Sequence, residues 1–106
     1  MIHVHAALDR GEDLFLVEIS GHAGYAPEGQ DIVCAAVSAL ALALHSYLAA
    51  YPEVCICAGR QSGGHARFTF RRTRRSQAVY EMAVMGLSAI AAEYPDHVRI
   101  VREILR

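Results

Sequence analysis

Cys34 and His22 are the two side chains of this chain whose types and positions suit nucleophilic chemistry. Asp31 is a preferred helix N-cap residue and a long, alanine-rich apolar segment follows it, so we expect a helix over residues 31–51. Cys34 then lies in the first helical turn, where unpaired backbone N–H groups and the positive end of the helix dipole favour a thiolate. The same N–H groups could stabilise the oxyanion that forms when a thiolate attacks a carbonyl carbon. Such a nucleophile lacks only a base.

His22 is the best-placed candidate for that base. It follows Gly21 at the end of a predicted strand, and a loop containing Gly24 and Gly29 connects it to the start of the helix. Glycines allow such a loop to bring the imidazole to the sulfur. The arrangement predicts a Cys–His pair of nucleophile and base.

Two further polar residues lie close to this pair in sequence. Asp31 could orient His22 or serve only as the helix cap. Ser38, one helical turn beyond Cys34, could bond near the sulfur or to its own helix backbone. With His45 these residues form one polar stripe along an otherwise apolar helix, which either faces water or lines a site.

A purely structural interpretation of the same residues stays open at this point. A cysteine in an alanine-rich helix is commonly a small buried apolar residue. A histidine after glycine at a strand end is commonly part of a turn. Residue types and spacing alone therefore leave both a cysteine hydrolase and a non-catalytic domain possible.

Hydropathy patterning predicts elements in the order ββαββαβ. The expected strands and helices cover residues 2–8, 14–20, 31–51, 54–60, 65–71, 76–94 and 98–102. We expect Gly11 to supply a positive φ in the first hairpin, Gln61-Ser62-Gly63-Gly64 to form the second turn, and Ser76 to cap the second helix. Both helices should end at Tyr-Pro followed by an acid. This order indicates a single α/β (α+β) domain over residues 1–106, with a small mixed, mainly antiparallel sheet and two helices.

Composition narrows the class of protein. The chain has 106 residues, 54% of them apolar, and a formal net charge of −1, which excludes disorder over most of its length and a globally basic nucleic-acid binder. The longest apolar stretch, residues 32–44, is interrupted by Ser38 and is shorter than the ~18–20 residues of a membrane span. Three cysteines are an odd number, which fits a reducing cytoplasm better than a disulfide framework. A helix apolar on nearly every side also predicts a homodimer.

One extended motif joins the candidate residues. The chain carries Gly21-His22-Ala23-Gly24, then Gly29, and then Asp31-Ile32-Val33-Cys34-Ala35-Ala36-Val37-Ser38-Ala39. This pattern resembles the signature of the ribosomal-processing cysteine protease family, Prp, whose members are small bacterial proteins of about this length. The resemblance covers essentially the whole chain, and Gly63-Gly64-His65 before a strand agrees with it. Ala36, where relatives often have glycine, and Val37 depart from the pattern at positions that bear on helix packing.

The resemblance implies a function and a site. Cys34 and His22 match the family's catalytic dyad, and Asp31 and Ser38 match its supporting positions. Family members are homodimers with a mixed α/β fold that remove the N-terminal extension of a large-subunit ribosomal protein in the bacterial cytoplasm. No cofactor or metal is implied. Gly24, Tyr25 and Gly29 then belong to a substrate loop, residues 23–30, which we expect to be mobile and to close over a peptide.

Three other features receive less weight. His3 and His5, and likewise Cys55 and Cys57, share a face of one predicted strand each, but neither pair has zinc-finger spacing. Six arginines fall within residues 60–75, and a non-catalytic dimeric module that binds ribosomes or RNA through them is the alternative function: Arg60, Arg67, Arg71, Arg72, Arg74 and Arg75. A third set of apolar residues predicts core or dimer packing: Met82, Met85, Leu87 and Ile90.

Overall fold

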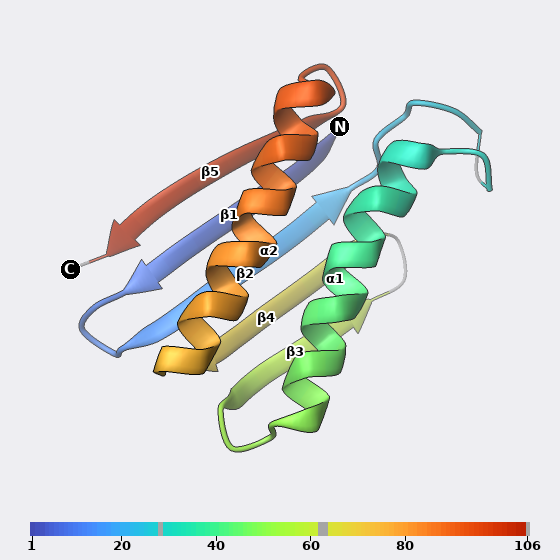
Figure 1. Cartoon of the computed structure of the whole chain (residues 1–106). Helices are drawn as coiled ribbons and strands as arrows, with labels where there is room; N and C mark the ends of the chain where they lie inside the picture. Colours follow the sequence, from blue (N-terminus) through green and yellow to red (C-terminus); the bar gives the residue numbers. More distant parts are fainter. Residues whose placement is uncertain (28, 62–63, 106) are drawn as a thin grey trace.

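A five-stranded sheet with two helices on one of its faces makes up the fold (Figure 1). The structure, a computed structural model, describes residues 1–27, 29–61 and 64–105. The elements are β1 (Ile2–Asp9), β2 (Leu14–Gly21), α1 (Ile32–Ala50), β3 (Cys55–Gln61), β4 (His65–Arg71), α2 (Arg74–Glu93) and β5 (Val98–Leu105). The strand order is β3-β4-β2-β1-β5, antiparallel throughout except for the parallel pair β1–β5. The predicted α+β class and element order are confirmed.

Alternation along the strands directs one set of side chains to the helices. In the three central strands every second residue is buried: Ile2, Val4 and Ala6 in β1, Phe15, Val17 and Ile19 in β2, and Ala66, Phe68 and Phe70 in β4; Ala7 of β1 is buried as well. Helix α1 contributes residues at helical spacing, Val33, Val37, Ala41, Leu44 and Leu48, and α2 contributes Tyr80, Val84 and Leu87. Periods of 2 and 3.6 thus meet in one shared core. Each fully buried large side chain in it is worth about 1.5–3 kcal/mol of transfer free energy.

Helix α1 begins as predicted, and the core of the domain accounts for the apolar residues on one of its sides. Asp31 is the N-cap, with its side chain accepting a hydrogen bond from the Cys34 N–H at 2.8 Å. By length and composition alone this 19-residue helix is apolar enough to cross a membrane. The interruption at Ser38 therefore does not by itself exclude a membrane span. One side of α1 packs on the sheet core, while Ile32 and Leu42 on the rest of its surface are exposed.

The cap predicted for α2 was wrong. Thr73 is the N-cap and Ser76 is the third helical residue. The two side chains bond each other's backbone N–H groups, at 3.0 and 2.7 Å, and form a capping box. Serine replaces the glutamate or glutamine usual at this third position, which is why the pattern escaped sequence analysis.

The first hairpin and the last strand also differ from expectation. Asp13, with φ of 57°, adopts the left-handed conformation expected of Gly11; Asp tolerates that region better than most residues. Strand β5 continues to Leu105 because it pairs with β1 along the full length of both strands. In the second hairpin, positions 62 and 63 lie outside the described residues.

A β-bulge at the start of β3 separates two cysteines. The pairing with β4 shifts between Cys55 and Cys57, so that Cys55 lies opposite Phe70 and Cys57 opposite Thr69. Cys55 therefore packs against the core, whereas Cys57 is exposed with its thiol near the Arg67 carbonyl. The prediction that both cysteines share one strand face was wrong, because a bulge adds one residue to the period of two.

Candidate active site

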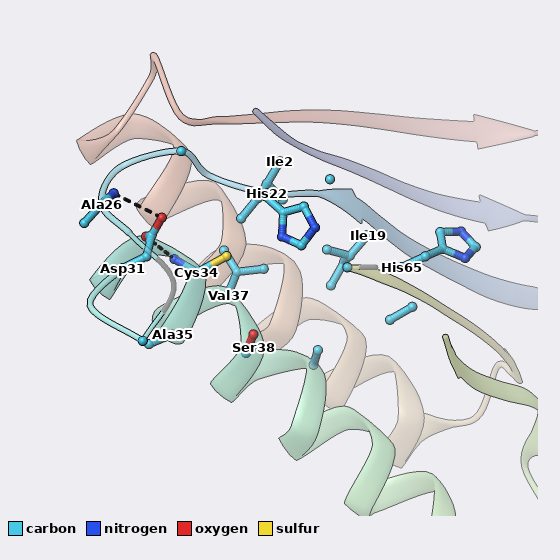
Figure 2. Close-up of a pocket in the computed structure, with 16 residues that line it drawn as sticks. Ile2, Ile19, His22, Ala26, Asp31, Cys34, Ala35, Val37, Ser38 and His65 are labelled. Atoms are coloured by element: carbon cyan, nitrogen blue, oxygen red, sulfur yellow. Dashed lines mark hydrogen bonds between the residues drawn. The ribbon is translucent and has the colours of Figure 1, made fainter. Parts of the chain in front are cut away.

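A groove of about 810 Å³ lies between the first turns of α1, the end of β2 and the start of β4. Its lining includes His22, Asp31, Cys34 and Ser38, together with Gly24 and Gly29 of the predicted substrate loop. The imidazole of His22 and the sulfur of Cys34 point toward each other across it (Figure 2). Two side chains that the sequence separates by a loop are thus neighbours in space.

Cys34 is the third residue of α1, in the first turn, as predicted. Its thiol is half-buried and makes no hydrogen bond with any of the described residues, while its backbone N–H donates to Asp31 Oδ1. The N–H of Ala35 donates to the Asp31 carbonyl at 3.0 Å. The N–H groups of Cys34 and Ala35 therefore both bond Asp31 and are not available for an oxyanion. The prediction from sequence had treated all the N–H groups of this turn as available.

Asp31 ties the loop to the helix. Oδ1 accepts from the N–H of Cys34, and Oδ2 accepts from the N–H of Tyr25 at 3.0 Å and of Ala26 at 3.4 Å. These bonds hold the pKa of the Asp31 carboxyl below its ordinary value of 3.8; the Cys34 N–H has the largest effect, and desolvation opposes it. Both carboxylate oxygens thus serve the backbone, and neither is hydrogen-bonded to His22.

Ser38 lies on the wall of the groove, one turn along α1 from Cys34 (Figure 2). Its side chain is exposed, and its hydroxyl bonds no described group, its own helix backbone included. It is free to meet a ligand in the groove. His45, the last member of the predicted polar stripe, does not line the groove, so the stripe is functional at most in its first half.

Two glycines set the position of His22. Gly21 has φ of +92°, and a Cβ there would lie 2.3 Å from the Met1 carbonyl oxygen. A Cβ on Gly64 would lie 3.0 Å from His22 Cε1 and 3.2 Å from Nε2. Gly64 is thus the wall against which the imidazole rests. Sequence reasoning missed this role because α1 and β3 separate Gly64 from His22 in the chain. Its place within Gly63-Gly64-His65 was the one sequence signal that marked it.

The predicted substrate loop divides between two environments. Gly24 and Gly29 line the groove with positive φ of +66° and +85°, and among the described residues, their chain neighbours aside, no atom lies within 4 Å of a Cβ built at either. Tyr25 is turned from the groove toward Tyr94 and His97. Glu28, within this loop, lies outside the described residues.

The features given less weight do not assemble into a second site. In the described ranges 1–27, 29–61 and 64–105, no group of three or more His, Cys, Asp or Glu side chains could hold a metal ion. His5 instead pairs with Glu103.

Several arginines of the 60–75 run have partners within the protein. Arg67 pairs with Glu18 at 3.5 Å and Arg72 with Asp13 at 3.6 Å. The Arg75 guanidinium lies 4.7 Å from the centre of the Tyr51 ring. The side chain of Arg60 is outside the described part. These partners favour a solvated surface over a binding patch.

An α+β domain that presents a helix-N-terminal thiol and an imidazole in one groove has the parts of a thiol peptidase. The family model of cysteine protease Prp matches residues 1–99, so the chain belongs to the cysteine protease Prp family and is a cysteine protease. The ribosomal processing cysteine protease Prp of Bacillus subtilis (strain 168) is 27% identical over an alignment of 117 positions, which covers 96% of this chain and 99% of that protein.

Two solved structures share the fold. The essential ribosomal processing protease Prp from S. aureus, with a covalently linked product peptide, superposes with a TM-score of 0.85 at 23% identity, covering 96% of this chain and 99% of that one. SMU.848 from Streptococcus mutans superposes with a TM-score of 0.76 at 26% identity, covering 98% and 95%.

Proposed function

We propose that this protease removes the N-terminal extension of a large-subunit ribosomal protein, with Cys34 as nucleophile and His22 as general base. The observation that carries the assignment is the groove that both side chains line, one from the first turn of α1 and one from the end of β2. The B. subtilis relative is a ribosomal processing protease, and the S. aureus relative has been seen with a substrate peptide, which supports the substrate class.

The reaction follows from these two groups. His22 takes the Cys34 proton, and the thiolate attacks the scissile carbonyl carbon to form a tetrahedral oxyanion. The oxyanion collapses, the C–N bond breaks, and the imidazolium gives its proton to the leaving amine, which leaves a thioester on Cys34. His22 then takes a proton from water, whose oxygen attacks the thioester carbon. The C–S bond breaks, the thiolate regains the proton, and the carboxylic acid product leaves.

The groove beyond the dyad suits an extended peptide. Its floor continues past Cys34 as an apolar surface of Ile19, Val37, Ala41 and Ala66. The two alanines leave room for an apolar residue next to the scissile bond. The Ser38 hydroxyl stands on the wall beside it and supplies a hydrogen-bonding group for the peptide backbone.

A homodimer in the bacterial cytoplasm belongs to the same proposal. Leu87 and Ile90 pack in or against the core, whereas Met82 and Met85 are 75% and 68% exposed. Ile32 and Leu42 of α1 are also exposed. Burial of these helix surfaces against a second copy would remove them from water. Sedimentation at micromolar concentration should show a dimer; a monomer of 11.6 kDa alone would contradict it.

Mass spectrometry of the host's own ribosomal protein precursor tests the activity directly. Incubation with the enzyme should release one N-terminal fragment, and the Cys34→Ala variant should release none. Salt-sensitive RNA binding that Cys34→Ala leaves unchanged, with no cleavage by either protein, would instead support the arginine-based binding module.

A further inference from the structure

The segment just after His22 is bonded to the connection between α2 and β5, which lies at the same end of the sheet (Figure 1). His97, in the connection between α2 and β5, places Nδ1 2.9 Å from the Ala23 carbonyl oxygen. A carbonyl can only accept, so the ring N–H donates. Ala23 is itself buried at 3% exposure. Because Ala23 follows His22 directly, this bond restrains the backbone from which the imidazole projects.

Tyr25 adds a second fastening to the same connection. Its ring meets Tyr94 at 5.6 Å and 81°, and His97 at 5.3 Å and 77°, both edge-to-face arrangements that aromatic rings favour. The Tyr25 ring is still 45% exposed, so contact with these two ring edges, rather than burial, holds it.

Asp31 supplies the third fastening, from the opposite direction. Its Oδ2 accepts from the N–H groups of Tyr25 and Ala26, while Oδ1 stays on the cap of α1. Residues 23–26 are therefore stretched between the connection after α2 and the first turn of α1, the turn that carries Cys34.

We propose that Tyr94 and His97 are positioning residues of the protease: by holding residues 23–26 in place they keep the His22 imidazole aligned with Cys34. The inference rests on the proposed roles of His22 and Cys34. It also divides the loop predicted to be mobile, residues 23–30, because these contacts hold only the part nearest His22.

The chain contains a matched control for this role. Tyr51 ends α1 as Tyr94 ends α2: both are C-cap residues before proline, with φ of −126° and −127°, and both donate their N–H one turn back, to Tyr47 and Ile90. Tyr51 contacts Tyr47 and Arg75, and its ring meets none of the loop residues that the structure describes. The two tyrosines thus share a structural task and differ in their contact with Tyr25.

Peptide turnover by Tyr94→Ala and Tyr51→Ala separates the two tasks. We expect similar falls in Tm, but a kcat lowered about ten- to a hundred-fold only in Tyr94→Ala, with KM little changed, because a misaligned base slows chemistry more than binding. Equal loss of kcat in both variants, or no loss in either, would overturn the proposal.

Variants of His97 supply a conservative rescue. His97→Asn keeps an N–H near the place of Nδ1, so kcat should recover most of what His97→Ala loses. Hydrogen exchange of the Tyr25 and Ala26 amides should quicken in His97→Ala and not in Tyr51→Ala. Unchanged exchange would contradict the fastening itself. Hydrogen exchange needs no substrate, so this test of the positioning role remains valid even if the wild type cleaves no ribosomal precursor. Absence of cleavage would contradict only the proposed function.

Discussion

The N-termini of the two helices use the same position in opposite ways. The third residue of α1 is Cys34 and that of α2 is Ser76, each a small side chain with one reactive heteroatom. The Ser76 hydroxyl is fully buried, donates to the Arg71 carbonyl at 2.7 Å and accepts from the Thr73 N–H at 2.7 Å. The Cys34 thiol bonds none of the described groups and faces a groove.

The cap residue explains this difference. Thr73 has one side-chain oxygen, which caps only the Ser76 N–H, and Ser76 reciprocates at the Thr73 N–H. Asp31 has two oxygens, and these serve the first turn of α1 and also two N–H groups of the loop. The side chain at the third position of α1 makes no bond in this cap, so it is left for chemistry.

The largest expected effect comes from removing the heteroatom at the third position of α1. Cys34→Ala should lower turnover by about 10³-fold or more, because no other group can form the thioester. Cleavage of a precursor peptide measures it, with the Tm as a check that the fold survives. Cleavage at the wild-type rate would mean that the nucleophile is a different residue.

Gly64→Ala should be the next most damaging change to activity. The added Cβ would lie 2.6 Å from the Gly21 carbonyl oxygen and 3.0 Å from His22 Cε1, both closer than an ordinary contact. The imidazole must therefore shift, and kcat should fall about 10²-fold. Gly59→Ala, in the same hairpin, serves as the control, because its added Cβ would lie 3.9 Å from the Cys57 sulfur, an ordinary contact distance. If both variants keep full kcat, the glycine wall has no part in aligning His22.

Alkylation compares the three thiols within one molecule. Cys57 is exposed, and Cys34 and Cys55 are only partly so; access alone therefore predicts fastest labelling at Cys57. Activation of the thiol by the helix N-terminus predicts instead that Cys34 is labelled about ten-fold faster than Cys55 or Cys57. Brief treatment with iodoacetamide and mass mapping decides between them. Equal labelling of all three would remove the case for an activated thiol.

Ser76→Ala is expected to change stability and not chemistry. It leaves the Thr73 N–H and the Arg71 carbonyl without their bonds to a fully buried hydroxyl, which should cost about 1–3 kcal/mol in the free energy of unfolding. Urea unfolding gives this value, and kcat should stay at the wild-type level. A stable variant with reduced turnover would contradict the contrast between the two helix starts.

The smallest effect concerns acid. Because the N–H bonds lower the pKa of the Asp31 carboxyl in the folded protein, its carboxylate adds stability that is complete above the ordinary value of 3.8 and is lost as pH falls through the lower folded value. Asp31→Asn should remove this part of the acid dependence while still capping α1. Its amide cannot accept at both former oxygens, so kcat should also fall modestly. Thermal unfolding from about pH 5 downward tests the first point. An unchanged acid limb would contradict it.

Local patterning was enough to predict much of this protein. Alternation and helical spacing predict the seven elements because each strand and helix buries a single face. Asp31 before an apolar run places Cys34 in a first turn, since capping depends on residues only a few positions apart. Thr73 was missed because Ser76, the third helical residue, is itself of a type that commonly caps helices.

The tertiary structure decided what meets what. The bulge at Cys55 turned two cysteines to opposite faces, the second hairpin brought Gly64 against His22, and the connection after α2 gave Tyr25 its partners. None of these contacts leaves a periodic signal, because each joins residues distant in the chain through the order of strands in the sheet. The sequence by itself determined the nucleophile's place on its helix. The alignment of the base depends on three segments that only the folded sheet holds together.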